Sequence, residues 1–284
     1  MNLHHRLIPA LLLLGTTGCW PSWPRIDGSW SDYSMPEQTD LYAHSGWTVP
    51  QGSYWSDNSP SGQVFWGVFD QPQTITGYEI LGTDGECVRH GDVSALLSHF
   101  DGSGSGSSTL VHHGSSLSLP WSTNSNVFVA SLGTNDVEPD TDYDLSQVQF
   151  GDYPAFALPG LLHSPVDDFH LDSPAIDGAT PGTADLNNLT FTWSGTPADR
   201  ISALFVTYTG RTQSDQVDCL VEDTGSLTVP ASLFPNSANA DQLYVFIGPD
   251  TFTGGVSPLD QKSAYRASTS LGQLGFLSLL PAGR

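Results

Sequence analysis

The densest group of potential metal ligands in the chain is an acidic segment at residues 136–144. Its carboxylates occur at every second position: Asp136, Glu138, Asp140, Asp142 and Asp144. Side chains at alternate positions of an extended segment point to one side, where like charges repel unless a cation lies between them. Calcium suits this pattern, because it is a hard cation that binds several carboxylate and carbonyl oxygens.

The spacing of these acids does not form an EF-hand loop. In a loop that begins at Asp136, Thr141 stands where Gly is required and Gln147 stands where Glu is required. A loop that begins at Asp140 fails as well. We therefore interpret the segment as a solvated acidic loop between strands, with a calcium site as the alternative.

Histidines of the first half form a second group of potential ligands, since neutral imidazoles bind zinc or copper. They are His90, His99, His112 and His113. None has the i, i+4 spacing of a helical zinc site, and no Cys-x-x-Cys pair accompanies them. We interpret them as solvent-facing loop residues, and we expect no metal or cofactor.

No local catalytic motif occurs in the sequence. The Gly/Ser run at residues 101–108 has Gly104 where the Gly-x-Ser-x-Gly elbow requires serine, and it has no lysine for a phosphate loop. We therefore expect that the protein is not an enzyme. An exported hydrolase without a local motif is the remaining enzymatic alternative.

Tryptophans are concentrated in the N-terminal part of the chain, because seven of the eight precede residue 122. Exposed aromatic rings stack on sugar faces. A carbohydrate-binding module of the cell surface is therefore an alternative function, with the rings from Trp20 to Trp55 and Trp121 as the binding surface. Trp66 and Trp193 are explained more simply as core residues of strands.

Period-two alternation predicts the elements that carry these residues. Leu189, Phe191 and Trp193 share one face of an extended segment, as in a half-buried antiparallel strand. Residues 64–69 and 243–247 are apolar on both faces and predict central strands. Turn residues separate the short strands, so the sequence predicts an all-β fold; one helix is predicted after Asp92.

The predicted strands recur in the same order in both halves, which indicates a diverged internal repeat. The clearest match is Ser-Leu-Ser-Leu-Pro, ending at Pro120, against Ser-Leu-Thr-Val-Pro, ending at Pro230. Each unit has about six or seven short strands over about 100 residues, as in immunoglobulin-like sandwiches. The sequence therefore predicts two tandem immunoglobulin-like β-sandwich units.

Cys87 and Cys219 occupy equivalent positions of the two predicted units. If each lies in the core of its own unit, a disulfide would need an interface that brings their Cα atoms within ~7 Å. We therefore expect free, buried thiols. A disulfide, which an oxidising envelope permits, is the alternative.

The N-terminus has the layout of a secretory signal peptide. Arg6 ends a basic head, residues 7–14 are apolar, and small residues lead to Gly18 and Cys19; the apolar run is too short to span a bilayer. This segment resembles a bacterial lipoprotein leader, in which the cysteine becomes the lipidated first residue of the mature protein. Thr16 departs from that pattern, which usually has Leu at this position. The resemblance implies lipidation of Cys19.

Location and partners follow from the leader and from the charge. In such leaders an Asp after the cysteine retains the protein in the inner membrane, so Trp20 implies an outer-membrane lipoprotein. The chain carries 30 acidic and 8 basic residues, a net charge of −22, and therefore repels nucleic-acid phosphates. The expected partners are the membrane, through a lipid on Cys19, and a protein or a glycan, but not a nucleic acid.

These observations divide the chain into four parts. They are a signal peptide (1–18), a Trp-rich tether together with the start of the first unit (19–60), a first β-sandwich unit with a Gly/Ser-rich excursion (61–160) and a second unit (161–284). The expected function is that of an envelope-anchored, non-catalytic lipoprotein that acts as a structural or interaction module.

Overall fold

The structure, a computed structural model, describes residues 44–54, 60–70, 80–90, 106–124, 127–132, 136, 138–147, 156–176, 182–256 and 264–280. Nearly all regular elements in these ranges are β-strands, so the all-β prediction is confirmed. The predicted signal peptide, Cys19 and the helix predicted after Asp92 lie outside the described residues. Among the described residues, no helix is long and apolar enough to cross a membrane.

The first half of the chain contributes nine strands. They are β1 (His44–Tyr54), β2 (Pro60–Asp70), β3 (Ile80–Asp84), β4 (Cys87–His90), β5 (Ser107–His112), β6 (Ser115–Ser122), β7 (Val127–Leu132), β8 (Asp142–Gln147) and β9 (Phe156–His163). The described part of the second half contributes eight strands and two short 3₁₀ helices. They are β10 (His170–Ser173), β11 (Thr183–Ala184), η3 (Leu186–Asn188), β12 (Leu189–Ser194), β13 (Arg200–Thr209), β14 (Thr212–Glu222), β15 (Ser226–Val229), η4 (Ala231–Leu233), β16 (Gln242–Val256) and β17 (Ala264–Leu279).

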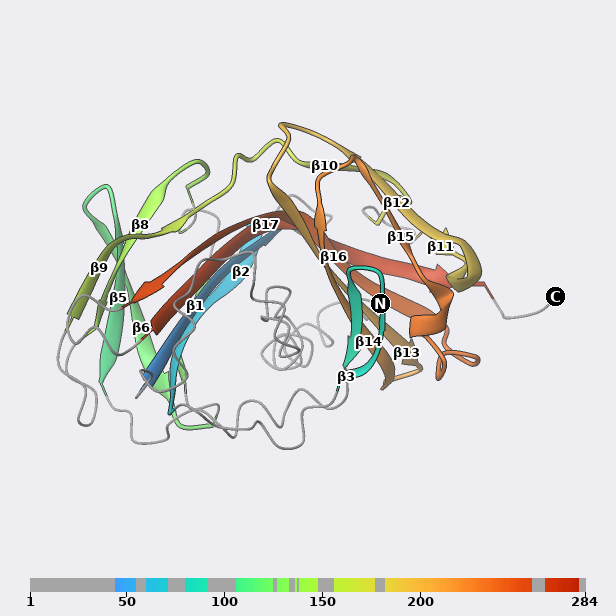
Figure 1. Ribbon diagram of the computed structural model, residues 1–284, viewed down its shortest axis with the longest axis horizontal. Coiled ribbons are helices and arrows are strands. Elements are labelled where there is room, and N and C mark those ends of the chain that lie inside the picture. Colours follow the sequence, from blue (N-terminus) through green and yellow to red (C-terminus); the bar gives the residue numbers. More distant parts are fainter. Residues whose placement is uncertain are drawn as a thin grey trace, which may run out of the picture.

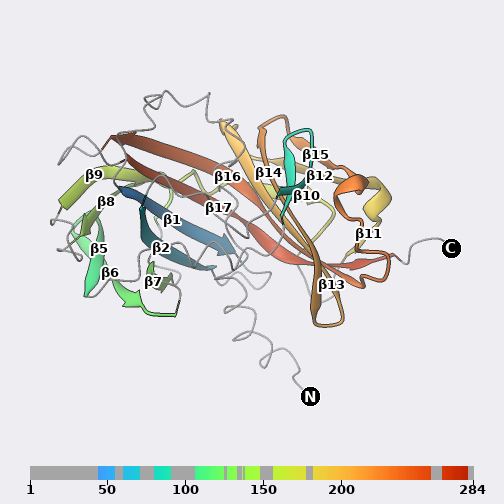
Figure 2. The ribbon, with the colours of Figure 1, turned by 60° about the horizontal axis from the view of Figure 1, so that its bottom comes forward.

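Most strands belong to one 14-stranded sheet, in the order β3-β4-β14-β13-β16-β17-β1-β2-β7-β6-β5-β8-β9, with β11 beside β17. A separate three-stranded sheet has the order β10-β12-β15. The long strands β16 and β17 run through both halves of the molecule (Figures 1 and 2). The first-half strands β1 and β4 pair with β17 and β14, so strand pairing crosses the predicted boundary at residue 160.

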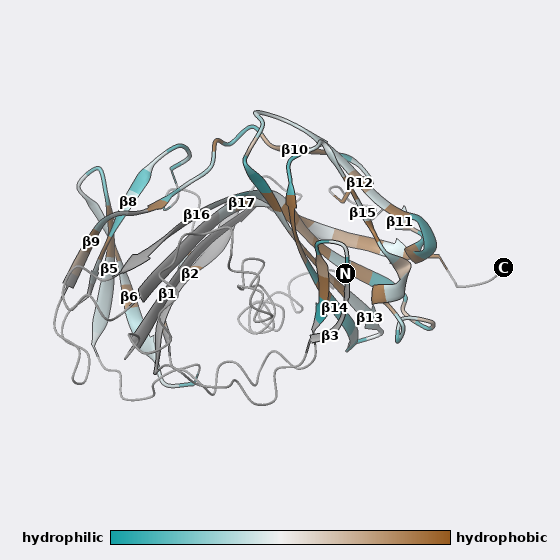
Figure 3. Ribbon diagram, in the orientation of Figure 1, coloured by the Kyte–Doolittle hydropathy of each residue, from teal (hydrophilic) through white to brown (hydrophobic). Residues whose placement is uncertain are grey.

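The C-terminal half is a two-layer sandwich. The three-stranded sheet lies over β13, β14, β16 and β17, and side chains from both layers form one hydrophobic core (Figure 1). In β12 the side chains of Leu189, Phe191 and Trp193 are buried, whereas Thr190 is exposed, so the predicted alternation is confirmed. Figure 3 shows the apolar positions of this half as brown bands along the strands.

The predicted central strands are central in the sheet. The run at residues 243–247 is fully buried and lies on β16, between β13 and β17. The run at residues 64–69 lies on β2, between β1 and β7. Neither position is at a sheet edge, and on β16 the side chains of both faces pack into hydrophobic clusters.

The first half forms a rolled sheet around its own core. From β17 the sheet continues through β1, β2, β7, β6, β5 and β8 to β9, which again contacts β16 and β17. Buried side chains of six strands fill the roll: Val64, Leu110, Leu119, Phe128, Leu132, Tyr143, Leu145, Leu158 and Leu162. The two halves therefore have separate hydrophobic cores although they share strands.

The strand β1 was not predicted, because its sequence contains Gly46, Pro50 and Gly52, which weaken strand propensity. The segment lies within residues 19–60, for which the sequence predicts a Trp-rich tether and the start of the first unit. It pairs antiparallel with β2 and in parallel with β17, and the parallel pairing skips Val49 and Pro50. Proline lacks the N–H group that the ladder needs, so the interruption at Pro50 is expected.

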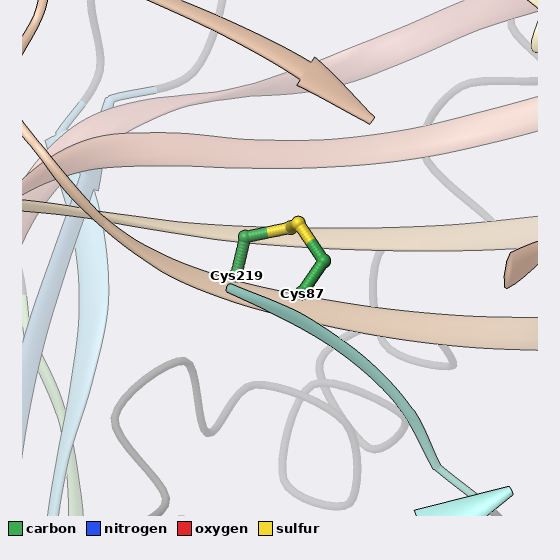
Figure 4. Close-up of a disulfide and its surroundings, with 2 residues drawn as sticks. All are labelled: Cys87 and Cys219. Carbon is green, nitrogen blue, oxygen red and sulfur yellow. A yellow bond between two sulfur atoms is a disulfide. The ribbon is translucent and has the colours of Figure 1, made fainter. Parts of the chain in front are cut away.

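Cys87 and Cys219 form a disulfide, and the prediction of free thiols is wrong (Figure 4). The prediction that both are buried is correct. Because β4 pairs antiparallel with β14, the two cysteines are directly opposite each other, with their Cα atoms 4.1 Å apart. The sequence argument assumed that each cysteine strand stays in its own unit, whereas the β3–β4 hairpin joins the sheet of the second half.

The segments that match in the repeat have different neighbours in the two halves. β2, which carries Trp66, pairs with β1 and β7, whereas β12, which carries Trp193, pairs with β10 and β15. The division into two halves is therefore visible in the hydrophobic cores and not in the strand pairing.

Candidate functional site

Three segments that are far apart in sequence meet at one end of the rolled sheet. They are the tip of the β5–β6 hairpin, the acidic segment before β8, and the end of β9 (Figure 1). The pairing of β8 with both β5 and β9 brings them together. This end therefore collects histidines and carboxylates that the sequence analysis treated as separate groups.

The alternation of side chains along β5 determines which way His112 points. Leu110 points into the core of the first half, and His112, two residues later, lies on the same face. Its ring packs against the ring of the buried Tyr143, with centroids 4.7 Å apart, and only 13% of its side chain is exposed. His112 is therefore a half-buried strand residue, and the prediction of a solvent-facing loop position is wrong for it.

His113 lies in the tight turn that follows. His112 pairs with Ser115, so the hairpin loop has two residues, His113 and Gly114, with φ angles of 42° and 81°. Two central residues with positive φ are typical of a type I′ turn, which prefers Asn-Gly. The side chain of His113 is 70% exposed, as predicted, and its Nδ1 lies 3.1 Å from Glu138 Oε2.

Glu138 is positioned by hydrogen bonds of its backbone. The Tyr143 hydroxyl accepts a hydrogen bond from the Glu138 N–H (2.6 Å) and donates one to the Glu138 carbonyl (3.1 Å). Ser164 Oγ donates a second hydrogen bond to that carbonyl (2.5 Å). Burial raises the pKa of the Tyr143 phenol, with a further contribution from the charge of Glu138, so the hydroxyl stays neutral and serves as donor and acceptor.

The loop between Glu138 and β8 is pinned to the residues after β9. The N–H of Asp140 donates to the Pro165 carbonyl (3.1 Å), and the N–H of Thr141 donates to Ser164 Oγ (3.0 Å). In turn, the Ser164 N–H donates to the Thr141 carbonyl (2.9 Å). Thr141 and Ser164 are both buried, so the loop is a fixed part of the fold.

His163 interacts with two carboxylates of the acidic segment. Its Nδ1 lies 2.8 Å from Asp142 Oδ1, and its Nε2 lies 3.4 Å from Asp140 Oδ1. Both carboxylates are largely exposed. Because the two acids face different ring nitrogens, they do not converge with His163 on a single point.

The acidic segment is a loop up to residue 141 and continues as the strand β8 from Asp142. The interpretation of the whole segment as a loop is therefore wrong for its second part. Asp142 and Asp144 lie on β8 with exposed side chains, and they alternate with the buried Tyr143 and Leu145. The strand is hydrophilic in Figure 3. Asp144 Oδ1 accepts a hydrogen bond from the Gly160 N–H (2.7 Å).

The carboxylates of the proposed calcium set have different partners. Glu138 faces the hairpin histidines, Asp140 and Asp142 face His163, and Asp144 faces a backbone amide. The charge of Asp136 acts on the phenol of Tyr143 and contributes to its raised pKa. The structure therefore arranges these acids beside histidines, a juxtaposition that no spacing in the sequence indicates.

One set of side chains has the geometry of a metal-ligand cluster. His112, His113 and Glu138 each place one potential ligand atom within 4.8 Å of the other two. Of the other histidines considered from the sequence, His90 lies on β4, without a described side chain, and His99 lies outside the described residues.

The tryptophans with described side chains are not exposed binding rings. Trp121 is half-buried and packs edge-on against Phe128, with centroids 5.0 Å apart. Trp193 is in the core of the sandwich, as predicted, and its Nε1 donates to Asp223 Oδ1 (2.7 Å). The rings from Trp20 to Trp30 and Trp55 lie outside the described residues, and the side chains of Trp47 and Trp66 are not described.

No protein-family model matches the chain, and no curated protein is significantly similar to it.

Proposed function

We propose that the protein is an exported lipoprotein, anchored in the cell envelope through Cys19, that acts as a non-catalytic structural or interaction module. The observation that carries the proposal is the apolar run 7–14 followed by Gly18 and Cys19. Such a leader directs export, and the cysteine after it is the residue that lipoproteins acylate. The Trp20 that follows favours the outer membrane.

The disulfide gives independent support for export. Cys87 and Cys219 are cross-linked inside the sheet, and disulfides persist in the oxidising compartments outside the cytosol. This argument uses none of the leader residues. Two unrelated features of the chain therefore favour the same destination.

Membrane partition of a Cys19→Ala variant tests the anchor. We expect the full-length chain in the membrane fraction and the variant in the soluble envelope fraction, since a chain without Cys19 has no site for the lipid. A Cys87→Ala/Cys219→Ala variant is the matched control and should stay in the membrane fraction. Unchanged partition of Cys19→Ala would refute the anchor.

We also propose that each half derives from an immunoglobulin-like unit. The two separate cores support this proposal for both halves, and the two-layer arrangement of β10, β12 and β15 over the main sheet supports it for the second half. Apart from Cys87, the buried residues of the sandwich core all come from residues 171–279. A fragment of residues 162–284 with Cys219→Ser should therefore unfold cooperatively on heating, and a fragment without a thermal transition would count against the unit.

The carbohydrate-binding alternative needs coplanar, solvent-facing rings. Trp121 packs on Phe128 and Trp193 is buried, so neither supports it. No described residue favours the alternative of an exported hydrolase. The structural or interaction module is therefore the function that we put forward.

A further inference from the structure

We infer that His112, His113 and Glu138 bind one divalent transition-metal ion, for which zinc is the best fit. The inference is independent of the membrane anchor. It rests on the geometry of the three side chains, on their chemistry and on the way the fold positions them.

The distances suit a tetrahedral ion. Ligand–metal bonds of about 2.0–2.1 Å place tetrahedral ligands roughly 3.3–3.4 Å apart. Glu138 Oε2 lies 3.1 Å from His113 Nδ1 and 3.4 Å from His112 Nδ1. The three potential ligand atoms all lie within 4.8 Å of one another, and His113, whose side chain is 70% exposed, is the ligand that would turn toward the ion.

The donor set selects the class of ion. Two imidazole nitrogens and one carboxylate oxygen are a set that zinc uses, with a fourth position left for water. Calcium and magnesium prefer oxygen ligands alone, so two nitrogens out of three disfavour both ions. The site therefore differs in residues and in metal from a calcium site made of alternating acids.

His112 supplies an unsatisfied ligand atom. Its Nδ1 is buried and has no hydrogen-bond partner among the described residues. The nearby Glu138 oxygen lies within ion-pair distance but not in hydrogen-bond geometry. A buried polar atom without a hydrogen bond costs free energy, and a bound metal ion would satisfy this nitrogen.

The backbone around the cluster is held in unusual conformations. Among the described residues, His113 and Asp140 are the two non-glycine residues with positive φ, at 42° and 50°. One is a ligand, and the other follows the ligand Glu138 by two residues. Such conformations are unfavourable for residues other than glycine and cluster at functional sites. A hairpin that needed only a turn would be better served by Asn at position 113.

The surrounding residues hold the ring of His112 and the backbone of Glu138 in place. Tyr143 supports the His112 ring on one side and holds both backbone groups of Glu138 on the other. Ser164 fixes the same carbonyl of Glu138. The ring of His112 and the backbone of Glu138 are therefore positioned before an ion binds, and the side chains of Glu138 and His113 complete the set.

Isothermal titration of the metal-stripped, full-length chain with zinc chloride tests the inference. The protein is prepared without a polyhistidine tag, because the imidazoles of a tag bind zinc themselves. We expect one zinc ion per chain with saturable binding. His113→Asn and Glu138→Gln should each weaken binding at least tenfold, because each removes a ligand; loss of supporting residues alone costs about 10–100-fold.

These variants separate ligand loss from unfolding. Asn is the preferred residue for the conformation at position 113, so His113→Asn should keep or raise the melting temperature of the metal-free protein. Without zinc, Glu138→Gln should melt close to the original chain. Added zinc should raise the melting temperature of the original chain and have little effect on either variant.

A matched control uses the neighbouring histidine. His163→Gln removes a nearby, partly exposed imidazole that faces Asp140 and Asp142, and it should leave zinc affinity unchanged. An ordinary ion pair between His113 and Glu138 predicts no saturable zinc binding, or binding that the three variants change equally. Either result, or calcium binding in preference to zinc, would overturn the inference.

Discussion

Two buried aspartates show how this acidic protein keeps carboxylates inside its sheets. Asp215 accepts hydrogen bonds from Ser237 Oγ (2.8 Å) and the Asn236 N–H (2.9 Å), and it pairs with Arg89 on β4 (3.3 Å). Asp250 accepts a hydrogen bond from Ser270 Oγ (2.6 Å). Burial raises the pKa of Asp250 to about 7, although the hydrogen bond from Ser270 and the charge of Arg200 act in the opposite direction.

The raised pKa predicts a pH dependence of stability. The unfolded chain releases the Asp250 proton near pH 3.8, whereas the folded chain keeps it up to about pH 7. The contribution of Asp250 to the free energy of unfolding is therefore fully present below pH 3.8 and is lost as the pH rises to about 7. A pKa raised from 3.8 to about 7 corresponds to at most roughly 4 kcal/mol.

Asp250→Asn should remove this dependence, because Asn resembles the protonated side chain. We expect the variant to be more stable than the original chain at pH 8 and the difference to shrink toward pH 4. Urea unfolding at several pH values measures it. Asp199→Asn, at an exposed loop position, is the control. A difference that does not change with pH would contradict the assignment.

At the scale of elements, the pair β16–β17 depends on two opposed glycines. Gly248 and Gly272 face each other where these strands pass between the halves. A Cβ at Gly272 would lie 2.8 Å from Gly248 Cα and closer still to the Ile247 carbonyl oxygen. These are backbone atoms, which cannot move aside without shifting a strand.

Gly272→Ala should therefore destabilise the protein by about 1–3 kcal/mol, the usual cost of overpacking. Urea unfolding followed by tryptophan fluorescence measures the change. Ser278→Ala, an exposed position on the same strand, should differ from the original chain by less than about 0.5 kcal/mol. Equal stability of Gly272→Ala and Ser278→Ala would show that the strands are not so closely paired.

At the scale of the whole molecule, the disulfide is a covalent link between the two halves. Cys87 and Cys219 are 132 residues apart in sequence, and their strands form part of one sheet. The cross-link restricts the unfolded chain over a long loop. The ion pair of Arg89 with Asp215 joins the same two strands close to the disulfide.

Removing the disulfide should lower the free energy of unfolding by about 2–5 kcal/mol. Cys87→Ala/Cys219→Ala tests this against the original chain in urea. In a Cys19→Ala background, which leaves two cysteines, thiol titration of the denatured protein should find no free thiol before reduction. Free thiols in that assay would support the sequence-based expectation and contradict the pairing.

The sequence determined local structure well where side-chain patterns are strong. The alternation of Leu189, Phe191 and Trp193 specified both a strand and its buried face, because the period of a strand is two residues. Apolar runs at 64–69 and 243–247 likewise predicted central strands. The strand β1 escaped prediction because Pro50 and two glycines hide its pattern.

Only the tertiary structure decided which strands are neighbours, because pairing depends on contacts distant in sequence and not on local propensity. It placed Cys87 opposite Cys219, and it brought His112 and His113 to Glu138 across 25 or more residues. The sequence contains these residues as separate groups with no spacing that relates them. The proposed leader, by contrast, depends on the sequence alone, since a short apolar run followed by Gly18 and Cys19 is interpreted without reference to the fold.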